Sequence, residues 1–383
     1  MGLFDFFTQK IGIDLGTSNT LVYVNNKGIT LNEPSVVAIN TTSYEVCAVG
    51  FDAKAMLERT PKTIRAIRPL QNGVIADFEI TRAMIKYFIT KALNKKRFIK
   101  SNIVISVPVG VTSIERRAVE EVAYDAGARK VKLVEEPMAA AIGAGLNVDQ
   151  PIGNMIVDIG GGTTEIAVIS LGGIVESDSL RIAGDDIDIN IKEYIKNKYK
   201  MDIGIVTAEN IKKVLGNASK EYYKRIIDSD ERIDSKEANE DNEDFEINED
   251  NKDKKDLKDK KDKKEKKDEK ENKKTDYVQQ MEIRGRDIVS GLPLKITITS
   301  DEVREAILET VNSIVNAIKR VLERTPPELS SDIYTNGIYL SGGGALLKGL
   351  DIYLEKETGI KVFIADNPLQ SVALGAGKIS EEL

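Results

Sequence analysis

The feature that most constrains the fold of this chain is a segment that occurs twice. Residues 11–24 and 155–169 each contain a β-branched apolar run, an aspartate, an apolar residue, a glycine, a short turn and a second β-branched run. This order predicts a strand, a tight turn and a second strand in each copy. The two aspartates, Asp14 and Asp158, lie 144 positions apart (158 minus 14). The repeat therefore predicts an α/β chain built from two related halves.

Both turns have the composition of anion-binding loops. Glycines permit positive φ and let backbone N–H groups converge on an anion. The hydroxyls of Thr17, Ser18 and Thr163 can donate hydrogen bonds to phosphate oxygens. Two such hairpins facing each other would grip a polyphosphate, and Asp14 and Asp158 would then hold Mg²⁺, through water as Mg²⁺ prefers. A single copy is better explained as an ordinary hairpin, but two copies in the same order favour a phosphate site.

Three further segments carry small residues. Residues 337–350 are typical of a strand, a glycine loop and a helix start, which permits close approach to a flat ligand such as a nucleobase or its ribose. Residues 134–145 contain a proline followed by a run of three consecutive alanines and predict a helix that begins near Glu136. Its carboxylates, Glu135 and Glu136, could polarise a water or simply interact with the helix dipole. Residues 371–378 resemble this segment, so we expect the two helices to cross and form a hinge.

Composition limits the available chemistry. The 383 residues contain no histidine and one cysteine. These counts exclude catalytic triads with histidine, imidazole acid–base catalysis, His- or Cys-cluster metal sites and internal disulfides. No Walker-type loop or dinucleotide-binding GxGxxG unit is evident. The longest uncharged stretch, residues 101–114, is too short to span a membrane, and no signal peptide is evident, so we expect a cytoplasmic location. Cys47, in the strand-like residues 46–49, is expected to be buried.

Residues 229–276 differ sharply in composition from the rest. They hold 20 acidic and 15 basic residues and very few apolar ones. Because so little apolar surface cannot offset the entropy of ordering, we expect a disordered charged insert. It could be a tolerated loop or a docking segment, and both alternatives stay open. Without it the chain has 40 basic groups (55 minus 15) and 42 acidic groups (62 minus 20), so no nucleic-acid partner is expected.

Five motifs in this order resemble the actin, Hsp70 and sugar-kinase superfamily: a first phosphate loop, a linking helix, a second phosphate loop, an adenosine loop and a second linking helix. The sequence is most similar to the MreB family of bacterial actins. The matching segments are DLGTSNT from Asp14, EEPMAAAIGAG from Glu135, DIGGGTTEIAVISLGGIV from Asp158, RIAGDDID from Arg181, GRDIVSGLP from Gly285 and SGGGALLKGL from Ser341.

The resemblance implies an actin-like fold, with two RNase H-like halves around a central ATP cleft. The first half would span residues 1–147, with the end of the chain packing back on it, and the second residues 148–366. Residues 367–383 would form the C-terminal linking helix, and the insert at 229–276 would lie within the second half. The resemblance also implies that the protein binds ATP or ADP with Mg²⁺ and is an ATPase whose activity is coupled to filament dynamics.

The family's motifs also imply site residues. Glu136, assisted by Thr163, would position the attacking water, and Asp14 and Asp158 complete the catalytic set as Mg²⁺ ligands through water. The first loop would contact the β- and γ-phosphates, residues 207–212 the ribose, and the third glycine loop the adenosine. The implied nucleotide-binding residues are Gly16, Thr17, Ser18, Asn19, Gly160, Gly161, Gly162, Thr163, Glu209, Lys212, Gly342, Gly343, Gly344, Ala345 and Leu346.

The function implied by the resemblance is self-assembly into filaments at the inner membrane surface that determine cell shape, or drive shape change or motility in wall-less cells. Envelope or cytoskeletal proteins are possible partners. Leu3, Phe6 and Phe7 share one helical face, and the basic segment 95–100 contains Phe98 and Ile99. Both could contact anionic lipid, or could pack as ordinary core and turn. The alternative function is a monomeric ATP-dependent enzyme or chaperone-like ATPase of the same superfamily.

Overall fold

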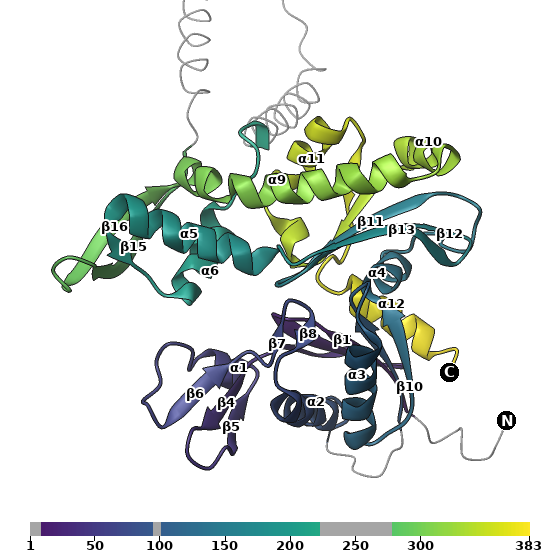
Figure 1. Ribbon diagram of the computed structural model, residues 1–383, viewed down its shortest axis with the longest axis horizontal. Coiled ribbons are helices and arrows are strands. Elements are labelled where there is room, and N and C mark those ends of the chain that lie inside the picture. Colours follow the sequence, from purple (N-terminus) through teal and green to yellow (C-terminus); the bar gives the residue numbers. More distant parts are fainter. Residues whose placement is uncertain (1–8, 95–100, 223–277) are drawn as a thin grey trace, which may run out of the picture.

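The computed structural model describes residues 9–94, 101–222 and 278–383. The predictions for the N-terminal segment, for residues 95–100 and for the insert at 229–276 lie outside these residues. The described chain forms an upper and a lower half that are joined on one side, as Figure 1 shows. Among the described residues, no helix is both long and apolar enough to cross a membrane.

The first half is built on a five-stranded sheet in the order β10-β9-β1-β2-β3. β1 (Gln9–Leu15), β2 (Asn19–Val24) and β3 (Gly28–Pro34) form an antiparallel meander. β9 (Ser101–Val107) and β10 (Ala128–Glu135) extend it in parallel. The predicted hairpin around Asp14 is thus confirmed as β1, a three-residue turn and β2.

The second half repeats this arrangement, with a sheet in the order β13-β12-β11-β17-β18. β11 (Asn154–Ile159), β12 (Thr164–Ser170) and β13 (Gly173–Leu180) are the antiparallel meander. β17 (Ile338–Ser341) and β18 (Val362–Ile364) extend it in parallel. The shared order and directions confirm two related α/β halves.

Helices cover both sheets. α2 (Phe78–Ala92) and α3 (Ser113–Asp125) share a hydrophobic core with the first sheet. In the second half, α5 (Gly184–Tyr199), α6 (Ile205–Leu215) and the 25-residue α9 (Ser300–Arg324) do the same. The apolar residues of α9 recur at helical spacing and are buried, which explains why this long segment is helical. The smaller elements are α1 (Phe51–Lys54), β4 (Val37–Asn40), β5 (Val46–Val49), β6 (Ile64–Ile67), β7 (Leu70–Gln71), β8 (Val74–Ile75), β14 (Met201–Asp202), β15 (Gln280–Asp287), β16 (Pro293–Thr299), α10 (Pro327–Asn336), α11 (Leu350–Thr358) and the 3₁₀ turn η2 (Gly343–Leu346).

Two helices of small residues join the halves. α4 (Glu136–Gly143) begins where its proline predicts, and it crosses α12 (Ser371–Ser380). A Cβ added to Gly143 would lie 1.8 Å from the Ser371 carbonyl oxygen, and one on Gly375 would lie 1.8 Å from the Ala139 carbonyl oxygen. The backbones therefore touch at the crossing, which only glycine permits at these positions. The predicted crossing of the two helices is confirmed.

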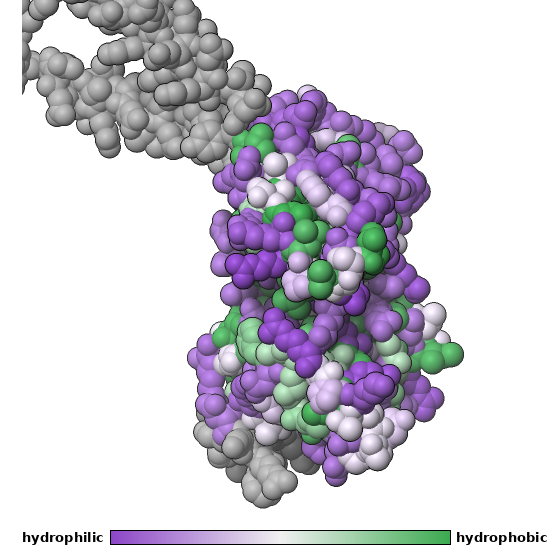
Figure 2. Space-filling model, turned by 90° about the vertical axis from the view of Figure 1, so that its left-hand side faces the viewer, coloured by the Kyte–Doolittle hydropathy of each residue, from purple (hydrophilic) through white to green (hydrophobic). Residues whose placement is uncertain are grey.

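The prediction that Cys47 is buried was wrong. Cys47 is exposed, although the strand predicted around it is present as β5. β5 lies at the edge of the three-stranded sheet β5-β4-β6, and its first two residues face solvent. Figure 2 views the molecule from this side, where the surface is mostly hydrophilic over the second half and more mixed over the first.

Candidate functional site

A cavity of about 600 Å³ lies between the two halves. This volume is in the range that accommodates a small organic ligand. The structure brings together at this cavity nearly all the residues singled out from the sequence: Asp14, Gly16, Thr17, Ser18, Asn19, Glu136, Asp158, Gly160, Gly161, Gly162, Thr163, Glu209, Lys212, Gly342, Gly343, Gly344 and Leu346. Ala345 is the exception, because it is fully buried within the core of the second half and does not line the cavity.

The two glycine-containing turns approach each other directly. A Cβ on Gly161 would lie 2.1 Å from the Ser18 hydroxyl oxygen, and one on Gly162 would lie 2.9 Å from the Thr17 side chain. No glycine of either turn adopts positive φ, so the expectation of positive φ was wrong there. Glycine is required for the close approach of the turns instead. In the third loop, Gly342 does have a φ of +79°.

Asp14 and Asp158 are the second-last residues of the first strand of each half and line the same cavity. Burial raises the pKa of Asp14 to about 8, the charge of Asp158 adds to this, and a hydrogen bond from Ser106 opposes it. Burial raises the pKa of Asp158 to about 6, against a 2.6 Å hydrogen bond from the Ser341 hydroxyl. Neither carboxylate forms an ion pair within the described chain. Two carboxylates without a cationic partner among the described residues, Asp158 buried and Asp14 partly buried, fit a divalent cation.

Glu136 is the first residue of α4 and lines the same cavity as Asp14 and Asp158. Only 7% of its surface is exposed. Burial raises its pKa well above the usual range, and the charges of Glu165, Asp14 and Asp158 add to this effect. Within the described ranges, no group of three Asp, Glu or Cys side chains is close enough to chelate a metal ion.

Two ion pairs join the halves at the cavity and were missed by sequence reasoning. Arg68 of the first half lies 2.5 Å from Asp185 at the start of α5, and Asp185 also accepts a 3.2 Å hydrogen bond from Ser18. Lys54 of α1 lies 2.9 Å from Glu209 of α6. Burial raises the pKa of Glu209, but hydrogen bonds from Lys213 and Lys54 outweigh this effect and lower the pKa to about 2. No local sequence pattern pairs residues so far apart in the chain.

Lys212 is held entirely by the second half. Its ammonium group donates a 2.7 Å hydrogen bond to the Gly184 carbonyl and forms a 2.9 Å ion pair with Asp188. Burial raises the pKa of Asp188 to about 6, although the charge of Lys212 opposes this. Because a carbonyl and a carboxylate of α5 both hold the ammonium group of this α6 residue, Lys212 is preorganised beside the second glycine turn.

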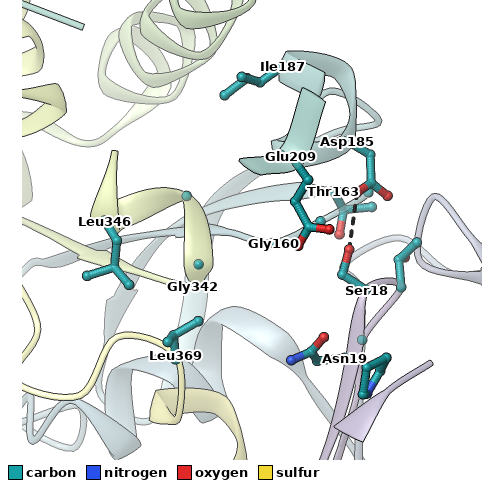
Figure 3. Close-up of a pocket in the computed structure, with 18 of the residues that line it drawn as sticks. Ser18, Asn19, Gly160, Thr163, Asp185, Ile187, Glu209, Gly342, Leu346 and Leu369 are labelled. Carbon is teal, nitrogen blue, oxygen red and sulfur yellow. Dashed lines mark hydrogen bonds between the residues drawn. The ribbon is translucent and has the colours of Figure 1, made fainter. Parts of the chain in front are cut away.

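The cavity has one polar and one apolar end. Figure 3 shows Leu346 and Leu369 on one side, and Ser18, Thr163 and Asp185 on the other, with Glu209 pointing into the space between them. Glycines of the third loop lie at the apolar end and leave room for a flat group. The arrangement suits a ligand with an apolar planar end and an anionic end.

Comparisons with known proteins agree with this geometry. Residues 8–234 and 257–383 match the profile of the family described as MreB/Mbl protein. The cell shape-determining protein Mbl of Bacillus cereus is 46% identical over 377 residues, which cover 98% of this chain and 97% of Mbl. The crystal structure of MreB5 of Spiroplasma citri bound to ADP superposes with a TM-score of 0.80 at 35% identity and covers 98% of this chain and 96% of MreB5. The MamK double helical filament shares the fold, with a TM-score of 0.72 at 19% identity over 97% of this chain and 98% of MamK.

Proposed function

The chain belongs to the MreB/Mbl family, and on this basis we propose that it is an ATP-hydrolysing cytoskeletal protein that polymerises into filaments at the cytoplasmic face of the membrane and determines cell shape. One observation carries the proposal: two facing phosphate-type turns line a single cavity between the halves, together with Asp14 and Asp158, which have no ion-pair partner among the described residues. The name of the Bacillus cereus relative, the ADP bound to MreB5 and the filament formed by MamK support it.

The polar end of the cavity would bind the phosphates. Backbone N–H groups of both turns and the hydroxyls of Thr17, Ser18 and Thr163 would donate hydrogen bonds to phosphate oxygens from opposite sides. Phosphoryl transfer requires mainly such positioning and charge stabilisation rather than covalent chemistry by the protein. The turns therefore supply what the reaction demands.

Asp14 and Asp158 would hold Mg²⁺ through water molecules. The bound ion would neutralise developing charge on the phosphates. Both carboxylates must be ionised for this role. Asp14, with its pKa raised to about 8, would therefore lose its proton when the metal–nucleotide complex binds near neutral pH.

Glu136 would orient the attacking water, with the Thr163 hydroxyl as the second contact. Glu136 projects into the cavity from the first turn of α4, and Thr163 closes the second phosphate turn. Both are almost fully buried, with 7% of their surface exposed. A water held by fixed side chains is constrained toward the angle of attack.

The apolar end would take the adenosine. Leu346 and the glycines of the third loop would contact the base, and Glu209 and Lys212 the ribose. Lys54 and Lys213 both contact Oε1 of Glu209, which leaves Oε2 to accept from a ribose hydroxyl. Ribose binding would in this way involve a side chain that already joins the halves.

Membrane attachment is proposed from the sequence of the segments containing Phe6, Phe7 and Phe98. Each contributes about 1.5–3 kcal/mol at most when buried, so stable binding requires many subunits in one filament. Nearby lysines favour anionic lipid at ~1 kcal/mol each. A monomeric ATP-dependent enzyme or chaperone-like ATPase is the alternative, and it would show no such dependence on assembly.

Co-sedimentation with anionic vesicles tests this attachment. With ATP and Mg²⁺ the protein should co-sediment, and the triple variant Phe6→Ser, Phe7→Ser, Phe98→Ser should not, although both form filaments. Tyr44→Ser, which removes an exposed aromatic side chain elsewhere, serves as the control and should behave as wild type. Equal co-sedimentation of the triple variant and wild type would refute the lipid contact.

A further inference from the structure

Glu165 is a buried carboxylate that the proposed function leaves without a role. It lies on β12 with no exposed surface, and it does not line the cavity. It forms no ion pair with any lysine or arginine that the structure describes. An acidic side chain buried without a cationic partner is costly unless hydrogen bonds compensate it, so its position calls for a physical reason.

The hydrogen bonds of Glu165 join the two halves. Its Oε1 accepts a 2.6 Å hydrogen bond from the hydroxyl of Ser179 on the neighbouring strand β13. Its Oε2 accepts a 3.2 Å hydrogen bond from the backbone N–H of Val109. Val109 belongs to the first half, in the turn between β9 and α3. The carboxylate therefore spans from the sheet of one half to a turn of the other.

The segment that Glu165 holds reaches both phosphate turns. Next to Val109, Pro108 packs on Gly73, where an added Cβ would lie 2.6 Å from the proline ring and 3.0 Å from Thr163. The N–H of Gly73 donates a 3.0 Å hydrogen bond to the Thr17 hydroxyl. Glu165 is thus one member of a closed ring of contacts that runs through the turns of both halves.

Glu165 also lies beside the carboxylates of the cavity. It is directly opposite Asp158 in the β11–β12 ladder, and opposite residues of an antiparallel pair share a face of the sheet. Among the neighbouring charges that raise the pKa of Glu136, the charge of Glu165 has the largest effect. Glu165 is therefore a close neighbour of the carboxylates that surround the site proposed for the attacking water.

We propose that Glu165 is a positioning residue for ATP hydrolysis. By tying β12 to the turn at 108–109, it fixes the separation of the two phosphate turns and with it the water site between Glu136 and Thr163. This inference rests on the proposed hydrolysis of ATP. A displacement of about 1 Å at such a site can reduce turnover about 100-fold, so loss of the tie should lower turnover while nucleotide still binds.

Two uncharged substitutions of similar volume separate the effect of the two hydrogen bonds of Glu165 from the effect of its negative charge. In Glu165→Gln the amide oxygen can accept from the Val109 N–H, and the amide nitrogen can donate to Ser179, whose hydroxyl also accepts. Glu165→Met fills the space but accepts neither bond. We expect Glu165→Gln to turn over within about threefold of wild type and Glu165→Met to be at least about tenfold slower, both with wild-type affinity for ATP. Thr310→Val, a buried change on α9 at a residue that does not line the cavity, should leave turnover unchanged.

The measurements are phosphate release at saturating ATP and Mg²⁺, binding of a fluorescent ATP analogue, and melting temperature. Equal turnover of the Gln and Met variants, at any level, would overturn the proposal, and so would a parallel loss of ATP affinity in Glu165→Met. Absence of phosphate release by wild type would overturn the proposed function as well. If Glu165→Met melts below the assay temperature, Pro108→Ala loosens the same segment. The turnover of Pro108→Ala must then fall at least about threefold with ATP affinity retained. Wild-type turnover in this variant would refute the positioning role of the segment that Glu165 holds.

Discussion

Oδ2 of Asp185 lies 2.5 Å from the Arg68 guanidinium, and Oδ1 of the same carboxylate accepts a hydrogen bond from the Ser18 hydroxyl. One side chain of the second half therefore contacts both the first phosphate turn and a basic residue on the far side of the cavity mouth. A ligand that attracts Ser18 to its phosphates would compete for one of these two bonds. We therefore expect the contact between the halves to depend on what occupies the polar end.

Removing the ion pair between Arg68 and Asp185 should weaken the contact between the two halves at the cavity. Arg68→Ala leaves Asp185 without its cation, and the pair is about three-quarters buried on each side. We expect nucleotide to dissociate a few-fold faster, consistent with about 1 kcal/mol for a partly screened pair. Stopped-flow release of a fluorescent nucleotide measures the rate. Arg82→Ala, which removes exposed ion pairs within the first half, is the matched control. Equal release rates for Arg68→Ala and wild type would show that the ion pair between Arg68 and Asp185 does not slow nucleotide release.

Glu136→Ala should bind ATP with Mg²⁺ as wild type does but release phosphate about 100-fold more slowly. The reason is that both phosphate turns remain while the carboxylate that faces the water site is lost. Phosphate release at saturating ATP and equilibrium binding give the two readouts. Glu135→Ala is the adjacent control, because Glu135 points to Arg116 at 2.8 Å instead of into the cavity. Undiminished release by Glu136→Ala would remove Glu136 from the catalytic set.

The raised pKa of Asp14 predicts how stability depends on pH without metal. The pKa is about 8 in the folded state and near 3.8 when unfolded, so the folded protein binds the extra proton between these values. Stability from this group therefore falls as pH rises through that window. In EDTA without nucleotide, the melting temperature should be higher near pH 6 than near pH 8, and Asp14→Asn should reduce the difference. An unchanged difference in Asp14→Asn would show that the Asp14 carboxyl is ionised in the folded protein.

Local sequence patterns predicted the elements that carry the site. The paired hairpins around Asp14 and Asp158, the helix start at Glu136 and the third glycine loop each depend on a few consecutive residues whose chemistry fixes the local backbone. The crossing of α4 and α12 was also predictable, since two runs of small residues can pack only by bringing their backbones together.

Contacts between distant residues could not be predicted from such patterns. Arg68 and Asp185 are paired because the two halves meet at the cavity, and nothing near either residue in the sequence indicates its partner. The bond from Val109 to Glu165 is hidden for the same reason. The exposure of Cys47 depends on the edge position of its strand, which is a property of the assembled sheet and not of the apolar run itself.

High-speed sedimentation of the purified full chain tests the central claim most directly. With ATP and Mg²⁺, and with phosphate release followed in the same sample, the protein should enter the pellet above a critical concentration and release phosphate. With EDTA it should remain in the supernatant. A protein that binds and hydrolyses ATP but stays in the supernatant at every concentration would contradict the account and establish the monomeric ATPase instead.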